Sequence, residues 1–352
     1  MTNKEIVFKI MDKLEKGHIN LWHDITKEEM YSRINVVEWD KLDDVSFDFE
    51  MMKLFSLFKD AHTRYFVKNK TLSNKLIFKD DKLYVLSNSH YLQIISINGI
   101  EVEKIYNEFA KLVCYETKEW KNKQVEIAFN SKYYYEMIGI KGELTALLRD
   151  SSSITLKEES KEEKEKRCRE FKPYSYEIMD EVLYLRYSAC RDDKDILFSD
   201  FVSKIKEDVT RLKIGQYILD VRGNAGGNSE ILNSFQDLVR EEKLDGVLLM
   251  DSGVFSSGRF ALAKFKKEFN TLLIGTPSGG AASSYGYNNN DSVENKNFSY
   301  SIRYWDFSDI FKTSGAIIPD IIVENTIEDM EKNYDRVLLK AFEVLKNKLK
   351  NR

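Results

Sequence analysis

Residues 246–286 restrict the possible folds of this chain more than any other stretch. The short apolar run at 247–250 is typical of a buried strand, and residues 257–269 have helical spacing with an apolar and a basic face. A second apolar run follows at 272–274. Strand, turn, helix and strand in this order predict a parallel crossover unit, because parallel strands need a crossover connection.

The turn of this unit carries Ser256, Ser257 and Gly258. A serine there lies at a helix N-terminus, where free backbone N–H groups favour negative charge. Such a position suits an acyl-transfer nucleophile and its oxyanion donors. Serine is also a preferred N-cap residue, so the turn by itself favours simple capping of the helix by Ser256 or Ser257.

The rest of residues 172–352 continues the alternation of strands and helices. This alternation predicts an α/β fold with a parallel-rich sheet covered on both faces. The further elements expected here are strands at 182–187, 217–221, 302–304 and 317–323 and helices at 198–212, 229–239 and 327–349.

An N-terminal helical region is expected at residues 1–74. A third helix at 47–60 is followed by a change to strand periodicity at 62–67, and His62 lies at that junction. Capping patterns mark the starts of the first two helices, at Thr2 with Glu5 and at Thr26 with Glu29.

Residues 75–156 predict a small β-rich module. The charged run at 157–171 is expected to be a solvated linker or loop, and it marks a domain boundary. The elements expected in the module are strands at 76–78, 83–86, 92–97, 125–129 and 154–156, a tight turn at Asn98-Gly99 and a helix at 102–113.

Composition excludes several classes of function. The 352 residues carry a net charge of −4 without a basic stripe, so nucleic acid is not an expected partner. The three cysteines are far apart and no histidine pair has helical spacing, so we expect no disulfide framework, metal or cofactor. No signal-peptide core or membrane-length apolar run is present, so a cytoplasmic protein without a membrane partner is expected. The oligomeric state stays open.

The glycine-rich segment at 222–228 follows an expected strand, a layout that also occurs in phosphate-binding loops. Its sequence fits neither common nucleotide-binding pattern and has no lysine in place for a phosphate. Two interpretations remain. The glycines serve a tight turn that demands positive φ, or the N–H groups of Gly226 and Gly227 point at a substrate carbonyl oxygen.

Four histidines are candidates for the base of a serine nucleophile, and all of them precede Ser256. This order argues against an α/β-hydrolase, and Val254 occupies the first glycine position of a GxSxG elbow. We expect His18 and His23 to be solvated and His90 to lie in a turn. His62, at a junction of elements, remains the candidate base, although a lone histidine is more often structural.

Four segments, taken together and in order, resemble the motifs of the tail-specific (C-terminal processing) and tricorn-core peptidases. Residues 60–63 (DAHT) are also similar to the short histidine motif of the tricorn-like branch. The four segments are 217–227 (YILDVRGNAGG), 254–258 (VFSSG), 274–280 (IGTPSGG) and 315–321 (GAIIPDI).

The resemblance implies a crotonase/ClpP-like ββα core at 172–352, joined to a PDZ-like module at 75–156. Residues 94–102 are similar to the PDZ segment of such enzymes, but a GLGF-type carboxylate-binding loop is missing. It also implies a serine peptidase that acts on a peptide or protein. A binding or scaffold protein on the same fold and a small-molecule hydrolase of crotonase-like type are the alternatives.

The resemblance places the nucleophile on Ser256 and the oxyanion donors on the N–H groups of Ser257 and of Gly226 or Gly227. Ala281 occupies the place of the lysine in the Ser–Lys branch, so His62 becomes the expected base.

Two positions depart from the tricorn-like pattern. Ala61 precedes the histidine where relatives have serine, and Lys312 stands where a glutamate is common. The acid that orients His62 is therefore open from sequence, with Asp60, Asp306 and Asp309 as substitutes.

Overall fold

The computed structural model describes residues 1–68 and 70–350, and the chain divides into two compact units. Unit 1 comprises Met1–Arg169 together with Ser284–Trp305, and unit 2 comprises Glu170–Ser283 and the chain from Asp306 onward. The predicted core at 172–352 differs in one respect, because its segment Ser284–Trp305 belongs to unit 1. None of the described helices is both long and apolar enough to cross a membrane.

Unit 2 is built on a sheet with the strand order β15-β12-β11-β10-β9-β8. All neighbouring strands pair in parallel except β8, which is antiparallel to β9. This agrees with the parallel-rich sheet expected from the sequence. The strands are β8 (Tyr174–Met179), β9 (Val182–Tyr187), β10 (Gln216–Asp220), β11 (Asp245–Met250), β12 (Leu272–Gly275) and β15 (Ile321–Ile322).

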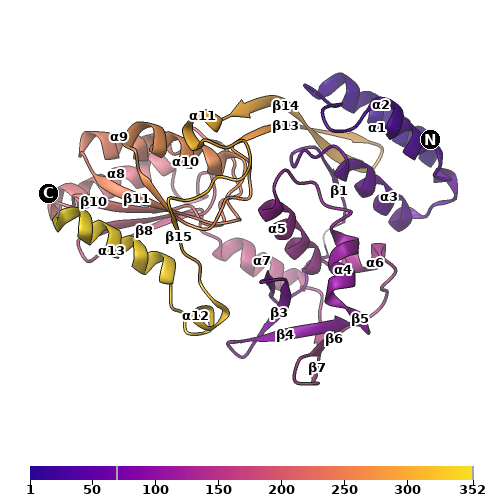
Figure 1. Ribbon diagram of the computed structural model, residues 1–352, viewed down its shortest axis with the longest axis horizontal. Helices are drawn as coiled ribbons and strands as arrows, with labels where there is room; N and C mark the ends of the chain where they lie inside the picture. Colours follow the sequence, from indigo (N-terminus) through magenta and orange to yellow (C-terminus); the bar gives the residue numbers. More distant parts are fainter. Residues whose placement is uncertain (69, 351–352) are drawn as a thin grey trace. The chain divides into compact units, whose positions relative to one another are not determined.

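Helices cover both faces of this sheet (Figure 1). On one face, α8, α9 and α10 pack on strand residues such as Leu219 and Leu248. On the other face, α13 packs on Ile218 and Val247, so the central strands are apolar on both sides. The helices of unit 2 are α8 (Phe198–Leu212), α9 (Asn233–Glu241), α10 (Ser257–Phe269), α11 (Ser308–Phe311), α12 (Ile327–Glu331) and α13 (Arg336–Lys350).

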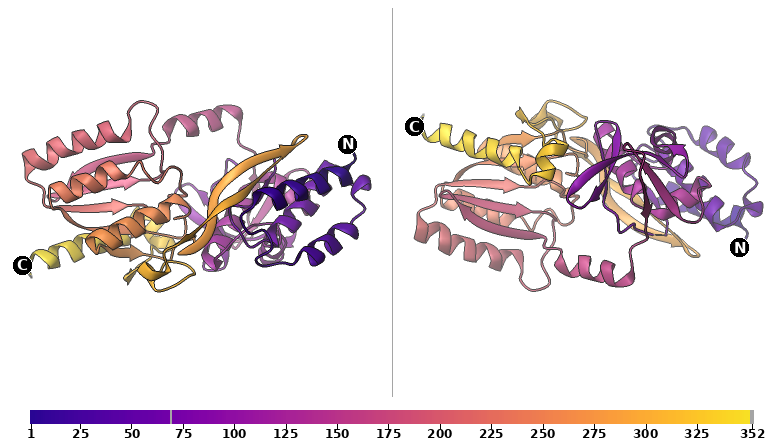
Figure 2. Two further views of the ribbon diagram at one scale, coloured as in Figure 1. Left: turned by 90° about the horizontal axis from the view of Figure 1, so that it is seen from above. Right: turned by 90° about the horizontal axis from the view of Figure 1, so that it is seen from below.

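Unit 1 begins with helices that pack on a long hairpin of β13 and β14 (Figure 2). Strand β1 pairs with β14 and extends the hairpin to the order β1-β14-β13. The capping signals at Thr2 and Thr26 are confirmed, since both hydroxyls accept the expected backbone N–H. These elements are α1 (Asn3–Gly17), α2 (Lys27–Asn35), the short 3-10 helix η1 (Trp39–Lys41), α3 (Asp44–Ser56), β1 (Arg64–Phe66), β13 (Ser283–Val293) and β14 (Lys296–Asp306).

A second sheet of unit 1, with the order β2-β3-β4-β6-β7, forms the β-rich module. Strand β5 pairs with β4 through the expected tight turn, where Asn98 and Gly99 have φ of 48° and 78°. The elements are β2 (Leu76–Lys79), β3 (Lys82–Ser87), β4 (His90–Ile97), β5 (Ile100–Glu101), α4 (Val102–Phe109), α5 (Lys118–Phe129), α6 (Lys132–Met137), β6 (Leu144–Leu148) and β7 (Ser153–Leu156).

Three predicted elements were wrong. Residues 125–129 end the helix α5, because Val125, Ala128 and Phe129 lie on one buried helical face. The charged run at 157–171 is solvated as expected but contains the exposed helix α7 (Lys161–Glu170), which a reciprocal cap between Ser160 and Glu163 begins. The closing helix at 327–349 is interrupted, so α12 and α13 are separate.

A buried carboxylate joins the separate segments of unit 1. Asp48 of α3 accepts hydrogen bonds from the hydroxyls of Tyr65 and Tyr133, each at 2.6 Å, and pairs with the Lys296 ammonium at 2.9 Å. Burial and the neighbouring Asp48 carboxylate raise the pKa of Tyr65 above its usual range, so this hydroxyl keeps its proton and donates. Asp48 thereby ties α3 to β1, α6 and β14.

We expect Asp48→Ala to lower the free energy of unfolding of unit 1 by about 3–5 kcal/mol, because a buried ammonium and two hydroxyls lose their partner. Urea unfolding followed by tryptophan fluorescence measures this, since all four tryptophans lie in unit 1. The control is Asp44→Ala, whose carboxylate is 66% exposed and 3.6 Å from the same lysine, with an expected loss below about 1 kcal/mol. Equal losses would contradict the role of Asp48.

Candidate active site

Ser256 lies between the end of β11 and the start of α10, as the sequence predicts. Its backbone has φ 46° and ψ −124°, a region that residues other than glycine rarely adopt. Its side chain makes no capping hydrogen bond to α10, so the role of Ser256 is not simple capping of this helix. A non-glycine residue in this conformation persists only when its surroundings hold it, and such positions cluster at functional sites.

Hydrogen bonds from both sides hold this turn. The N–H of Phe255 donates to Asn224 O at 3.0 Å, and the N–H of Arg259 donates to Ser256 O at 3.0 Å. The guanidinium of Arg259 is buried, donates to Ser256 O at 3.3 Å and also donates to Ala281 O. The turn is thereby fixed to the glycine-rich loop before it and to the segment of Ala281 after it.

The glycine-rich loop lies directly against Ser256. A Cβ atom on Gly226 would lie 2.8 Å from both Ser256 Cβ and the Ser257 nitrogen, and the φ of Gly226 is +111°. A Cβ atom on Gly227 would lie 2.2 Å from the carbonyl oxygen of Cys190. Only glycine fits at both positions, which agrees with the close backbone approach and the positive φ expected for this loop.

The N–H groups of this loop differ in what they bind. The N–H of Gly226 donates to the side-chain oxygen of Asn224 at 2.9 Å, so it is already engaged. Within the described residues, the N–H groups of Ser257 and Gly227 have no acceptor, while the Ser257 hydroxyl donates to Gly227 O at 2.6 Å. Ser257 and Gly227 therefore offer the backbone donors that an oxyanion needs.

A buried ion pair anchors the start of the same loop. Asp220, at the end of β10, accepts hydrogen bonds from Arg222, Arg186 and the Tyr184 hydroxyl. Arg222 also pairs with Asp335 at 2.7 Å. Burial opposes the charge of Arg222, but hydrogen bonds to Asp220 and Asp335 outweigh it and raise the pKa of this guanidinium.

In unit 1, His62 lies in the loop between α3 and β1, and Asp60 holds that loop. One oxygen of the buried Asp60 carboxylate accepts the His62 N–H at 2.8 Å. The other accepts the Thr63 hydroxyl at 2.6 Å and lies 3.0 Å from His18 Nε2. His18 is therefore buried, and its predicted solvation was wrong, because its ring pairs with a carboxylate inside the unit.

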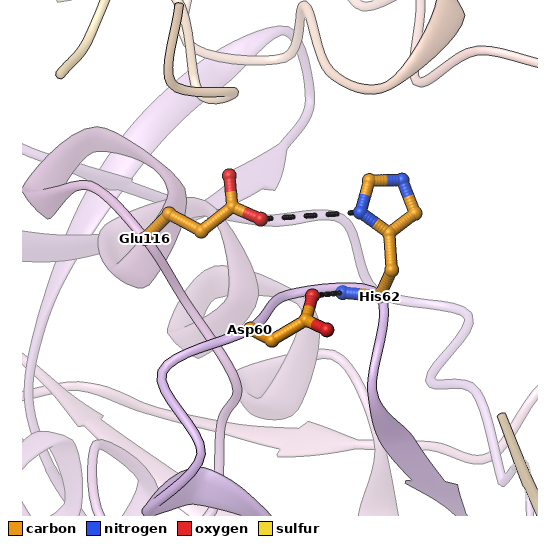
Figure 3. Close-up of side chains that lie close together, drawn as sticks. All are labelled: Asp60, His62 and Glu116. Carbon is orange, nitrogen blue, oxygen red and sulfur yellow. Dashed lines mark hydrogen bonds and ion pairs between the residues drawn. The ribbon is translucent and has the colours of Figure 1, made fainter. Parts of the chain in front are cut away.

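The His62 ring faces a carboxylate that the sequence did not single out. Glu116 Oε1 lies 3.9 Å from His62 Nδ1, and the two side chains are 9% and 5% exposed (Figure 3). Glu116 directly precedes Thr117, the N-cap of α5, and lies far from His62 along the chain. A Cβ atom on Gly286 of β13 would lie 3.4 Å from His62 Cε1, so the hairpin packs against another part of the ring.

Asp60, His62 and Glu116 have possible ligand atoms within 4.8 Å of one another and are the residues that a cation could approach. Asp60, however, already accepts hydrogen bonds from the His62 N–H, the Thr63 hydroxyl and His18. The structure thus uses Asp60 to order the loop, and a metal would have to displace these donors.

The remaining predicted positions have other surroundings. Ala281 is buried and offers no titratable group where the other branch has lysine. Lys312 is an exposed residue at the end of α11, and Asp309 is also exposed. Asp306 accepts hydrogen bonds from Ser283 and Ser308, which lower its pKa to about 2 and engage it within its own loop.

The serine and the glycine loop lie in unit 2, and the histidine with its two neighbouring carboxylates lies in unit 1. Ser256 and His62 belong to different units, and the partnership of their side chains stays a prediction.

The chain has the fold of C-terminal processing proteases, as the motifs imply. Mature CPAF complexed with lactacystin aligns with a TM-score of 0.73 and 11% identity, over 100% of this chain and 99% of the other. The photosystem II D1 C-terminal processing protease aligns with a TM-score of 0.52 and 9% identity, over 92% and 94% of the two chains. No family model and no curated protein sequence matches this chain.

The stability of unit 1 is expected to depend on the charge of Asp60. Burial opposes ionisation, but the hydrogen bond from His18, the nearby His62 and the hydrogen bond from Thr63 prevail and hold the pKa of Asp60 below its ordinary value. A depressed folded-state pKa adds stability that is complete above the ordinary aspartate pKa of about 3.9. This stability is lost as the pH falls through the lower folded-state value.

Asp60→Asn should therefore lower the free energy of unfolding by about 3 kcal/mol at neutral pH. Below about pH 4, the free energies of unfolding of the variant and of the wild type should become more similar, because Asp60 of the unfolded wild type begins to lose its charge. Urea titrations with tryptophan fluorescence at several pH values measure the difference. Asp12→Asn is the control, because its carboxylate is 57% exposed in a surface pair. A difference that is constant from pH 7 to acid would be evidence against this linkage.

Proposed function

We propose that this protein is a serine peptidase with Ser256 as nucleophile and His62 as base. The observation that carries the proposal is the strained turn at Ser256, whose hydroxyl does not cap the helix and whose side chain lies against Gly226. The fold shared with C-terminal processing proteases supports a peptide or protein substrate.

In the first step, Ser256 Oγ attacks the carbonyl carbon of a peptide bond and His62 takes the hydroxyl proton. The negative charge that develops on the carbonyl oxygen is accepted by the N–H groups of Ser257 and Gly227. Such donors are positioned before the reaction, so they stabilise the transition state without reorganisation. Gly226 allows the close approach, and its own N–H keeps Asn224 in place.

In the second step, the C–N bond breaks, and His62 returns the proton to the leaving amine. The acyl group remains on Ser256 Oγ as an ester. Water then attacks this ester and gives a proton to the same histidine, which passes it to Ser256 Oγ as the carboxylic acid product leaves. The cycle uses protein groups and water alone.

A fluorophosphonate probe tests the nucleophile, because it forms a covalent bond with activated serines. We expect labelling of the wild type and of Ser252→Ala, a neighbouring control, and no labelling of Ser256→Ala. His62→Ala should slow labelling and lower kcat/KM for an unstructured peptide by about 10⁴-fold or more, because the serine loses its base. Intact folding is checked by tryptophan fluorescence.

The outcomes separate the alternatives. Equal labelling of the wild type and Ser256→Ala would remove Ser256 as nucleophile. Peptide affinity without turnover, unchanged in Ser256→Ala, would favour a binding or scaffold protein. Turnover of acyl thioesters or simple esters but of no peptide would favour a small-molecule hydrolase.

A further inference from the structure

We propose that Glu116 is the positioning acid for His62, in place of the glutamate that Lys312 replaces. Glu116 holds the proton of the imidazole on Nδ1, so that Nε2 carries the lone pair that accepts the proton of the nucleophile. The catalytic consequence rests on the proposed function, whereas the orientation of His62 can be measured without it.

Glu116 is the carboxylate that faces the ring of His62. Its Oε1 atom lies 3.9 Å from Nδ1, and both side chains are more than nine-tenths buried. Its second oxygen, Oε2, is buried and accepts no hydrogen bond from the described residues. A buried carboxylate oxygen without a donor is costly, so a small rotation of the Glu116 carboxylate that turns Oε2 toward His62 Nδ1 is favourable.

The backbone around Glu116 fixes its approach to His62. The Thr117 hydroxyl accepts the N–H of Trp120 at 3.0 Å, which sets the start of α5 immediately after Glu116. The N–H of Ala61 then donates to Glu116 Oε1 at 3.4 Å, a long contact that places the same oxygen beside the His62 loop. Glu116 is thus held from two sides, by its own helix start and by the residue before the histidine.

Asp60 cannot take this role. Its oxygens accept the backbone N–H of His62 and the side chains of Thr63 and His18, so it positions the backbone and not the ring (Figure 3). The two carboxylates therefore have different roles. Asp60 orders the loop, and Glu116 faces the Nδ1 side of the imidazole.

The chemical consequence follows from the two ring nitrogens. A carboxylate at Nδ1 favours the tautomer with the proton on Nδ1, and Nε2 is then the basic nitrogen. When Nε2 takes the proton of Ser256, the imidazolium faces the Glu116 carboxylate, which stabilises its charge. The proton passes on to the leaving amine from Nε2, while Glu116 stays ionised throughout.

Nitrogen-15 NMR of histidine-labelled protein tests the orientation directly. At about pH 8.5, well above the ordinary histidine pKa, the signals that disappear in His62→Ala should show a protonated Nδ1 and an unprotonated Nε2. In Glu116→Gln this pattern should change toward a mixture of tautomers. A wild-type His62 with its proton on Nε2 would overturn the proposal, whatever the activity.

Kinetics test the consequence. Glu116→Gln should lower kcat by about 10²- to 10⁴-fold with little change in KM, because the base loses its orientation and not its substrate. Glu119→Gln is the matched control, since it makes the same change three residues away in the first turn of α5. It should leave both the NMR pattern and kcat unchanged.

The two proposals fail in different ways. If Glu116→Gln loses the tautomer pattern but the wild type is not labelled at Ser256, the orienting role of Glu116 is supported and the peptidase function is rejected. Normal kcat in a folded Glu116→Gln variant would reject the role of Glu116. Changes in the His62 signals on adding EDTA to the purified protein would also reject it, because a bound cation would then occupy the space beside Nδ1.

Discussion

The contact between the Gly226 backbone and the Ser256 side chain is the constraint on which the rest of unit 2 depends. Ser256 takes a positive φ, and Gly226 lies so close that any side chain there would collide with it. Strain of this kind persists only where the surroundings determine the conformation. Here Asn224, Arg259 and the buried pair of Asp220 with Arg222 do so.

The parallel sheet explains why these residues meet. Strands β10 and β11 are neighbours, so the glycine-rich loop after β10 and the serine turn after β11 leave the same edge of the sheet. Ligands in open α/β sheets commonly bind beyond the carboxyl ends of the strands. The fold thus brings together two loops that are separated along the chain by α9 and β11.

In unit 1, the polar side chain of His62 is buried and needs partners. Asp60 accepts hydrogen bonds from the backbone N–H of His62 and from His18, and Glu116 lies near the His62 ring. Buried polar groups need partners, and a network that satisfies them fixes one geometry. The β13–β14 hairpin contributes as well, because Ser299 donates to the carbonyl oxygen of His62 at 2.7 Å.

The sequence by itself determined the alternating α/β pattern, the start of α10 directly after Ser256, the glycine loop and the candidacy of His62, because these depend on local periodicity, capping and motif order. It misplaced residues 125–129 as a strand, since a short apolar run fits either a strand or the end of a buried helix. Only the tertiary structure decided that the hairpin Ser284–Trp305 joins unit 1, that His18 is buried against Asp60 and that Glu116 faces His62. The physical reason is that such contacts join residues far apart in sequence, whose approach depends on how whole elements pack.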